Sequence, residues 1–153
     1  MDERLQTSLK KIIREEYAFI MFNPSISKLI IFQKYHKYAL MAFQPALQKE
    51  LGQLVANKGK LEVRLVVNHY EAVLEKLLAT PISKGKITNA LMHIFGYFKD
   101  KITAQEKEIF LKDIDAFYNG KNNYERITEK LVEWAKEYNV EYIEGQSMLK
   151  LFR

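Results

Sequence analysis

The segment SKGKITNALMHIFGYF, residues 83–98, contains several side chains within a short span that could take part in binding or acid–base chemistry. Positions three and four apart share one face of a helix, which predicts a single ridge made of Asn89, His93, Gly96 and Tyr97. An imidazole one turn after an amide can bond to that amide or to a ligand, and a glycine beside it permits close approach. The ridge therefore predicts a contact surface or an acid–base site, although helix packing explains the glycine equally well.

The residues before this ridge are basic. Lys84, Gly85 and Lys86 are predicted to form a flexible loop that leads into the helix. One glycine is too little for either familiar phosphate-binding loop. The two lysines are instead candidates for neutralising an anion.

The other two histidines lie in different surroundings. His36 falls on an apolar helical stripe, which predicts a core histidine with its hydrogen bonds satisfied more readily than a functional one. His69 stands between Asn68 and Tyr70. No HExxH or other metal-ligand spacing connects the histidines, so neither a metal nor a cofactor is expected.

Other kinds of catalytic site find little support. The chain has no cysteine, which excludes disulfides, thiolate-bound zinc and an iron–sulfur cluster held by its own thiolates. No serine sits in a recognised nucleophile motif. Carboxylate pairs such as Asp113 with Asp115, or Glu125 with Glu129, have lysines nearby and are typical of solvated helix faces. No catalytic residue is assigned on these grounds.

The charge distribution favours an anionic partner. The formal net charge of +5 is uneven, because residues 1–101 hold 16 Lys and Arg against 9 Asp and Glu, whereas residues 102–153 hold 8 against 10. Such an excess indicates nucleic acid above other partners, while a lysine-rich solvated surface is the plainer explanation. Lys34 and Lys37 lie in the basic part, together with Tyr35, Tyr38, Tyr70 and Tyr97. Any of these rings that is exposed could stack on unpaired bases, but most of them are expected to be core or half-buried tyrosines anchored through the hydroxyl.

Helical periodicity predicts one compact all-α domain, residues 1–153, with about seven helices and mostly antiparallel neighbours. The helices are expected at residues 2–22, 25–43, 46–56, 61–79, 87–98, 103–119 and 124–138, and residues 140–143 are the only candidate for extended structure.

Several residues predict where these helices begin or end. Asp2 and the pair Thr103 and Glu106 have the spacing of N-terminal caps, and Gly120 is placed as a C-terminal stop. Pro24 suits a first helical turn. Gly52, inside a helix, suggests that another backbone packs close to it.

No apolar run approaches the length of a membrane span, and the N-terminus lacks the pattern of a signal peptide. We therefore expect a cytoplasmic protein without a membrane partner.

Several stretches together resemble the YbgA-like domain of unknown function, from residue 32 to the C-terminus, behind an N-terminal helix at 1–24. The resemblance lies in the sequences FQKYHKYALMAF, LGQLVA, TNALMHIFGYF and YIEGQSML, and in Tyr70. The matching residues are His36, Lys37, Gly52, Tyr70, Asn89, His93, Gly96, Tyr97 and Gln146.

The resemblance implies an all-α domain that is found alone or fused behind an iron–sulfur desulfidase acting on 4-thiouridine in transfer RNA. In such fusions the helical part is thought to help hold the RNA. The chain departs from the family where histidine is usual, at Gln33, Phe43 and Ile87, and again at Phe117 and Tyr118. A proline-rich segment of the family is replaced by residues 121–126.

Three hypotheses follow. The first is a non-enzymatic RNA-binding or accessory module for structured RNA, such as transfer RNA. Its binding residues would be Lys34, Lys37, Lys84, Lys86, Asn89, His93 and Tyr97. The second is a small enzyme with His93 or His36 as general acid or base. The third is a protein that binds a separately encoded desulfidase or a DNA repair enzyme. The second hypothesis predicts a pocket that joins His36, Asn89 and His93, and the deciding observation is whether these three residues and Lys37 meet in one cleft.

Overall fold

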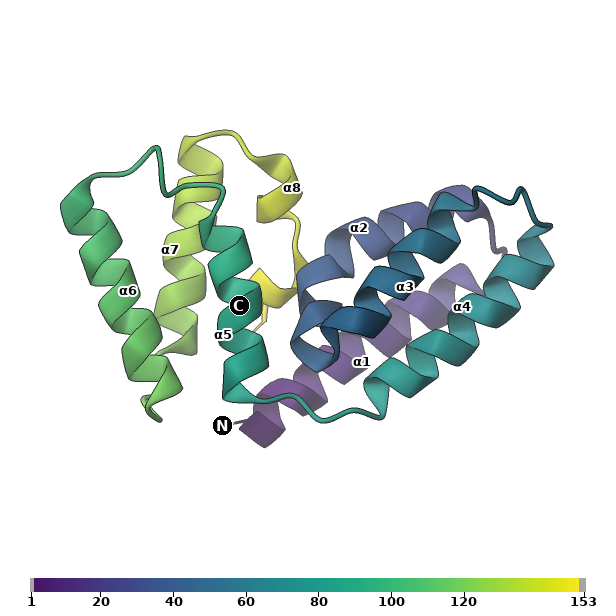
Figure 1. Cartoon of the computed structure of the whole chain (residues 1–153), viewed down its shortest axis with the longest axis horizontal. Coiled ribbons are helices and arrows are strands. Elements are labelled where there is room, and N and C mark those ends of the chain that lie inside the picture. Colours follow the sequence, from purple (N-terminus) through teal and green to yellow (C-terminus); the bar gives the residue numbers. More distant parts are fainter. Residues whose placement is uncertain (1, 152–153) are drawn as a thin grey trace.

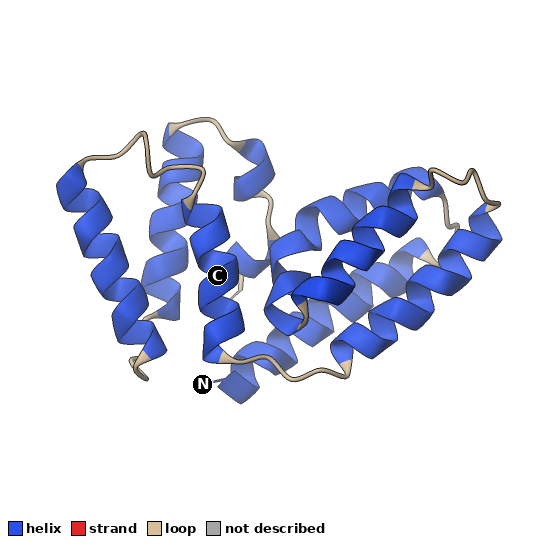
Figure 2. Ribbon diagram, viewed as in Figure 1, coloured by secondary structure: helices blue, strands red, loops and turns tan. Residues whose placement is uncertain are grey.

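The computed structural model describes residues 2–151 and shows an all-α protein, with no strand in this range (Figure 2). The elements are α1 (Asp2–Ile20), α2 (Ile26–Phe43), α3 (Pro45–Ala56), α4 (Val63–Leu78), α5 (Lys84–Phe95), α6 (Ala104–Tyr118), α7 (Tyr124–Glu137), α8 (Glu141–Glu144) and the 3₁₀ helix η1 (Ser147–Leu149). The predicted fold class is confirmed, with α8 and η1 in addition to the seven expected helices.

Helix α2 is the central element of the fold. It contacts α1, α3, α4, α5, α8 and η1. Its C-terminal half is buried on every side, from Tyr38 to Phe43, as is typical of a helix that lies inside a protein. Ser25 caps the start of α2 by accepting the backbone N–H of Lys28.

Two groups of helices meet at α2 (Figure 1). Helices α1 to α4 form one group, and α5 to α8 form the other, with the segment between α4 and α5 joining them along one edge. The second group has an aromatic core in which Trp134 lies beside Phe95, Phe98 and Phe110. Residues at the junction of the two groups therefore come from distant parts of the sequence.

The local signals at helix ends have mixed outcomes. The capping box is confirmed, because Thr103 accepts from the backbone N–H of Glu106 and the Glu106 carboxylate accepts from that of Thr103, both at 3.0 Å. Gly120 has the left-handed φ of 101° expected of a helix stop. Pro24 precedes the cap Ser25 and so lies outside the first turn of α2. The predicted capping side chain of Asp2 lies outside the described part of the chain.

Three predictions about backbone structure are wrong. Residues 84–86 are the first turn of α5 and not a loop, because the hydroxyl of Ser83 accepts the backbone N–H of Lys86 and caps the helix there. Residues 140–143 lead into α8 and are not extended. No backbone crowds Gly52, since the atom nearest to a Cβ at that position would be Nε2 of Gln33, at 3.8 Å.

Within residues 2–151, no helix is long and apolar enough to cross a membrane.

Candidate functional site

A groove of about 840 Å³ follows α3 along its whole length. Side chains from α2, α3, α4, α5 and the loop between α3 and α4 line it. Its apolar floor includes Met41, Leu54 and Val66, and its polar lining includes the amides of Gln48, Gln53 and Asn57. We refer to this feature as the α3 groove.

The titratable side chains that line the α3 groove are basic, with one exception in the phenol of Tyr38. Within the described part of the chain they comprise three lysines and two histidines, with no Asp or Glu: Lys37, Lys49, Lys58, His69 and His93. None of the five forms an ion pair with another residue of the described chain. A groove with one sign of charge and no internal counter-ions attracts ligands of the opposite sign.

The α3 groove joins two of the residues expected to form one cleft. Lys37 and His93, from α2 and α5, both line it. The predicted ridge of Asn89, His93, Gly96 and Tyr97 is exposed along α5 and the turn after it. Of these four residues, His93 lines the groove and Asn89 does not. His36 is absent from the lining, so the expectation that it would meet His93 is wrong.

Three tyrosines cluster beside the α3 groove. The hydroxyls of Tyr38 and Tyr97 are 3.5 Å apart, and the ring of Tyr142 lies about 6 Å from both of their rings, at 6.2 Å and 6.0 Å. Burial, followed by the bond to Tyr97, raises the pKa of Tyr38, which keeps it a neutral phenol. The ammonium of Lys34 lies 5.9 Å from the centre of the Tyr142 ring, and that of Lys37 lies 5.6 Å from the Tyr38 ring.

The two lysines at the start of α5 have different surroundings. Lys86 donates from Nζ to the carbonyls of Phe43 and Pro81, each at 2.6 Å, and its partial burial lowers its pKa. These bonds tie the end of α2 to the segment before α5 and occupy two of the three N–H donors of the ammonium, which gives Lys86 a structural role. Lys84 is half-buried beside Gly120 and lies outside the α3 groove.

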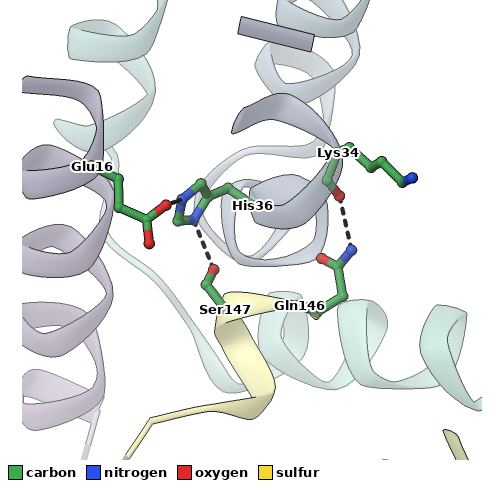
Figure 3. A network of polar contacts seen from close by, with 5 residues as sticks. All are labelled: Glu16, Lys34, His36, Gln146 and Ser147. Atoms are coloured by element: carbon green, nitrogen blue, oxygen red, sulfur yellow. Dashed lines mark hydrogen bonds and ion pairs between the residues drawn. The ribbon is translucent and has the colours of Figure 1, made fainter. Parts of the chain in front are cut away.

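His36 belongs to a separate polar network (Figure 3). Its Nδ1 lies 2.8 Å from Oγ of Ser147, and its Nε2 lies 2.5 Å from a carboxylate oxygen of Glu16. The imidazole is only 1% exposed, which confirms the prediction of a buried histidine with satisfied hydrogen bonds. The His36 bond also holds the pKa of Glu16 below its usual value.

Other residues shared with the resembled family have structural contacts. Gln146 is fully buried and bonds to the backbone of α2 at Lys34 (Figure 3). Tyr70 is fully buried and donates its hydroxyl to Oε1 of Gln33 at 2.7 Å, while Nε2 of Gln33 donates to the carbonyl of Gln48. Gln33, which departs from the family, therefore links α2, α3 and α4.

Sequence reasoning missed four residues of these two sites. Lys49 and Lys58 appear in the sequence only as part of a general lysine excess, although their places on α3 and in the turn after it were available as a signal. Glu16 and Ser147 carry no local signal, because they lie 20 and 111 positions from His36. Among residues 2–151, no three His, Asp or Glu side chains are grouped closely enough to hold a metal ion.

Comparison with known proteins gives two matches. The model of the family described as "Protein of unknown function (DUF1722)" matches residues 37–152. The chain is also 23% identical over 125 residues to the "Uncharacterized protein YbgA" of Escherichia coli (strain K12), which covers 81% of this chain and 74% of that protein. No solved structure matches the chain significantly. Since the family model spans most of the sequence, including the α3 groove, the tyrosine cluster and Gln146, the chain belongs to the DUF1722 family.

Proposed function

We propose that this protein is an RNA-binding or accessory module that holds the phosphate backbone of structured RNA, such as transfer RNA, in the α3 groove. The observation that carries the proposal is the lining of the groove, in which three lysines and two histidines meet without a carboxylate. Lysines that are not already paired can neutralise phosphates and release counter-ions, which is the main source of affinity for nucleic acid.

The tyrosine cluster supports RNA over a small anion. Tyr38 lines the groove, and its partner Tyr97 is 39% exposed at the adjoining surface. An aromatic ring beside a basic groove can stack on an unpaired base, which gives affinity with little sequence preference. In this arrangement Lys37, Lys49 and Lys58 bind phosphates, His93 contacts the backbone, and Tyr97 stacks.

Two other predicted contacts extend this surface. Lys34 lies over the Tyr142 ring of the same cluster, and Asn89 is exposed one turn before His93 on α5. Both are placed to bind RNA that extends beyond the groove. Fusion of the resembled domain to a transfer RNA desulfidase favours transfer RNA as the partner.

Filter binding of transfer RNA across a salt series tests the proposal. If three phosphates are neutralised, the logarithm of the binding constant should fall with the logarithm of salt concentration with a slope of about −2 to −3. The triple variant Lys37→Glu, Lys49→Glu and Lys58→Glu should bind at least tenfold more weakly at low salt.

The matched control changes three exposed lysines outside the groove: Lys99→Glu, Lys121→Glu and Lys136→Glu. It alters the net charge by the same amount as the groove variant. Because its three lysines lie outside the groove, it should retain most of the affinity. Equal losses in the two triple variants, or no binding by the unmodified protein at low salt, would contradict the proposal.

A protein-interaction function is the second candidate, because large apolar side chains are exposed where α1 and α2 meet. Phe19 is 77% exposed and lines a groove together with Ile20 and Ile31, and Phe22, in the turn after α1, is 88% exposed. Apolar clusters of this kind mark contact surfaces. A purified desulfidase provides the test, since Phe19→Ser with Ile31→Ser should abolish its binding, whereas unchanged binding would exclude this surface.

A further inference from the structure

The hydrogen bonds around His36 run in the same direction as those in a catalytic chain of serine, histidine and carboxylate. Glu16 lies at Nε2 and Ser147 lies at Nδ1. Because the pKa of Glu16 is lowered, its carboxylate is ionised at neutral pH and acts only as an acceptor. The proton of a neutral His36 therefore sits on Nε2, which leaves Nδ1 as the acceptor for the hydroxyl proton of Ser147.

This arrangement supplies the parts that activate a serine. A base within hydrogen-bond distance of the hydroxyl, itself oriented by a third group, is the general pattern of an activated nucleophile. Here the carboxylate fixes the tautomer and orientation of the imidazole, as it does in a serine–histidine–acid triad. In that triad the serine lies at Nε2 and the acid at Nδ1, whereas here Ser147 lies at Nδ1 and Glu16 at Nε2. This difference does not change the direction of proton transfer, which runs from the serine to the histidine.

A cavity of about 550 Å³ gives access to this network, since Glu16, His36 and Ser147 all line it. The serine is 4% exposed, while the side chain of Glu16 is 55% exposed at the cavity rim. Among residues 2–151, Glu141, Glu144 and Lys150 also line the cavity, so the carboxylates of the described lining outnumber its ammonium groups. Such a lining favours an ester whose acyl group is neutral or positively charged over one that carries a carboxylate.

We propose that Ser147 is a nucleophile, His36 its general base and Glu16 a positioning residue for hydrolysis of small esters, at a site separate from the α3 groove. Oγ of Ser147 bonds to the carbonyl carbon, the π electrons of the C=O bond move onto its oxygen, and the hydroxyl proton passes to Nδ1 of His36. The C=O bond then re-forms as the bond from that carbon to the alcohol oxygen breaks, and Nδ1 returns the proton to the departing alkoxide. Water adds to the resulting acyl-serine while Nδ1 takes its proton, the bond from the acyl carbon to Oγ breaks, Nδ1 returns the proton to Oγ, and the carboxylic acid is released.

Covalent labelling with a fluorophosphonate tests the nucleophile, because the serine oxygen displaces fluoride from phosphorus. Intact mass and peptide mapping of the full chain should show one adduct, on Ser147. Ser147→Ala should remove it, whereas Ser27→Ala, at an exposed position on α2, should label at the unmodified rate. No adduct on Ser147 in a protein with the expected helical circular dichroism would overturn the proposal.

The roles of His36 and Glu16 are tested by the rate of labelling. His36→Gln should lower the rate by about a hundredfold or more, which is the usual contribution of a general base. Since His36 is buried and its replacement can prevent folding, Glu16→Gln at the rim provides the second measurement. It should lower the rate at least tenfold without loss of helicity, and Glu16→Asp, which retains the carboxylate, should recover part of the loss. An unchanged rate in Glu16→Gln would refute its positioning role.

The substrate class is tested with two 4-nitrophenyl esters. The ester of alanine, with a free ammonium group, should be hydrolysed faster than the monoester of succinate. The reverse order would refute the inference drawn from the carboxylates in the cavity.

Discussion

The side-chain amide of Gln146 bridges the backbone of α2 at Lys34 and Tyr38, two residues one helical turn apart. Its Nε2 donates to the carbonyl of Lys34 at 2.8 Å, and its Oε1 accepts the backbone N–H of Tyr38 at 3.5 Å. A third bond, from Nε2 to the carbonyl of Tyr142, fixes the amide within its own segment. The segment leading into η1 is thereby attached to the central helix beside the tyrosine cluster.

Replacing Gln146 by leucine should destabilise the protein by about 1–3 kcal/mol, because the new side chain has a similar size but removes the three hydrogen bonds of the buried amide, including the one to the carbonyl of Tyr142. Urea unfolding measures the change. Gln105→Leu, at an exposed position on α6, is the matched control and should stay within about 0.5 kcal/mol of the unmodified protein. Equal stability of the two variants would contradict a structural role for the amide.

Lys86 should contribute to stability and not to RNA binding. Lys86→Met retains most of the aliphatic stem but removes both bonds to backbone carbonyls, so we expect a loss of about 1–3 kcal/mol in the free energy of unfolding. Affinity for transfer RNA, measured under conditions where the variant is folded, should change less than twofold. Lys99→Met, on an exposed turn, serves as the control for stability. A loss of RNA binding without a loss of stability would instead show that Lys86 contacts the RNA.

The capping box at α6 should make stability depend on pH in the acid range. The backbone N–H of Thr103 lowers the pKa of Glu106 in the folded protein, below its ordinary value of 4.5. A carboxyl whose pKa falls on folding stabilises the native state above that ordinary value, and this stabilisation is lost as the pH falls through the lower, folded value.

Glu106→Gln keeps the capping geometry but removes the titration, so it should flatten the fall in stability as the pH drops below the ordinary carboxyl pKa of 4.5. Urea unfolding at several pH values checks this, with Glu129→Gln on the exposed face of α7 as control. Parallel profiles for Glu106→Gln and the unmodified protein would show that this carboxylate does not contribute.

Gly120 should tolerate substitution poorly because of its backbone conformation. With φ at 101°, any side chain is strained there, and Gly120→Ala should cost about 1 kcal/mol or more. Gly59→Ala is a matched comparison, since Gly59 lacks a positive φ and a Cβ there would meet only Leu61 at 4.0 Å. That variant should be neutral or slightly stabilising. A similar thermal midpoint for both variants would show that the turn after α6 relaxes without cost.

The sequence predicts features that depend on neighbouring residues. Thr103 and Glu106 are three positions apart, so a capping box follows from local geometry, and the burial of His36 follows from the apolar stripe on which it lies. The start of α5 at Lys84 also has a local cause, because the side chain of Ser83 caps the helix. The sequence predicts a loop there because Gly85 stands between two lysines, Lys84 and Lys86.

Contacts between distant elements could not be predicted in this way. Periodicity indicates which face of α2 is buried but not which helix covers it. Thus His36 and Lys37, adjacent in sequence, line different cavities, one with Glu16 and Ser147 and the other with His93. The direction in which each side chain leaves α2 decides its partners, and only the three-dimensional arrangement of α1, α5 and η1 shows them.

The N-terminal helix has a practical consequence for work on this family. The family match begins at residue 37, inside α2, whereas α1 supplies fully buried Leu5, Leu9 and Ile13 and the carboxylate that bonds to His36. A fragment trimmed to the matched region would lack more than half of its central helix and would expose buried apolar side chains to water. Expression and truncation studies should therefore retain α1.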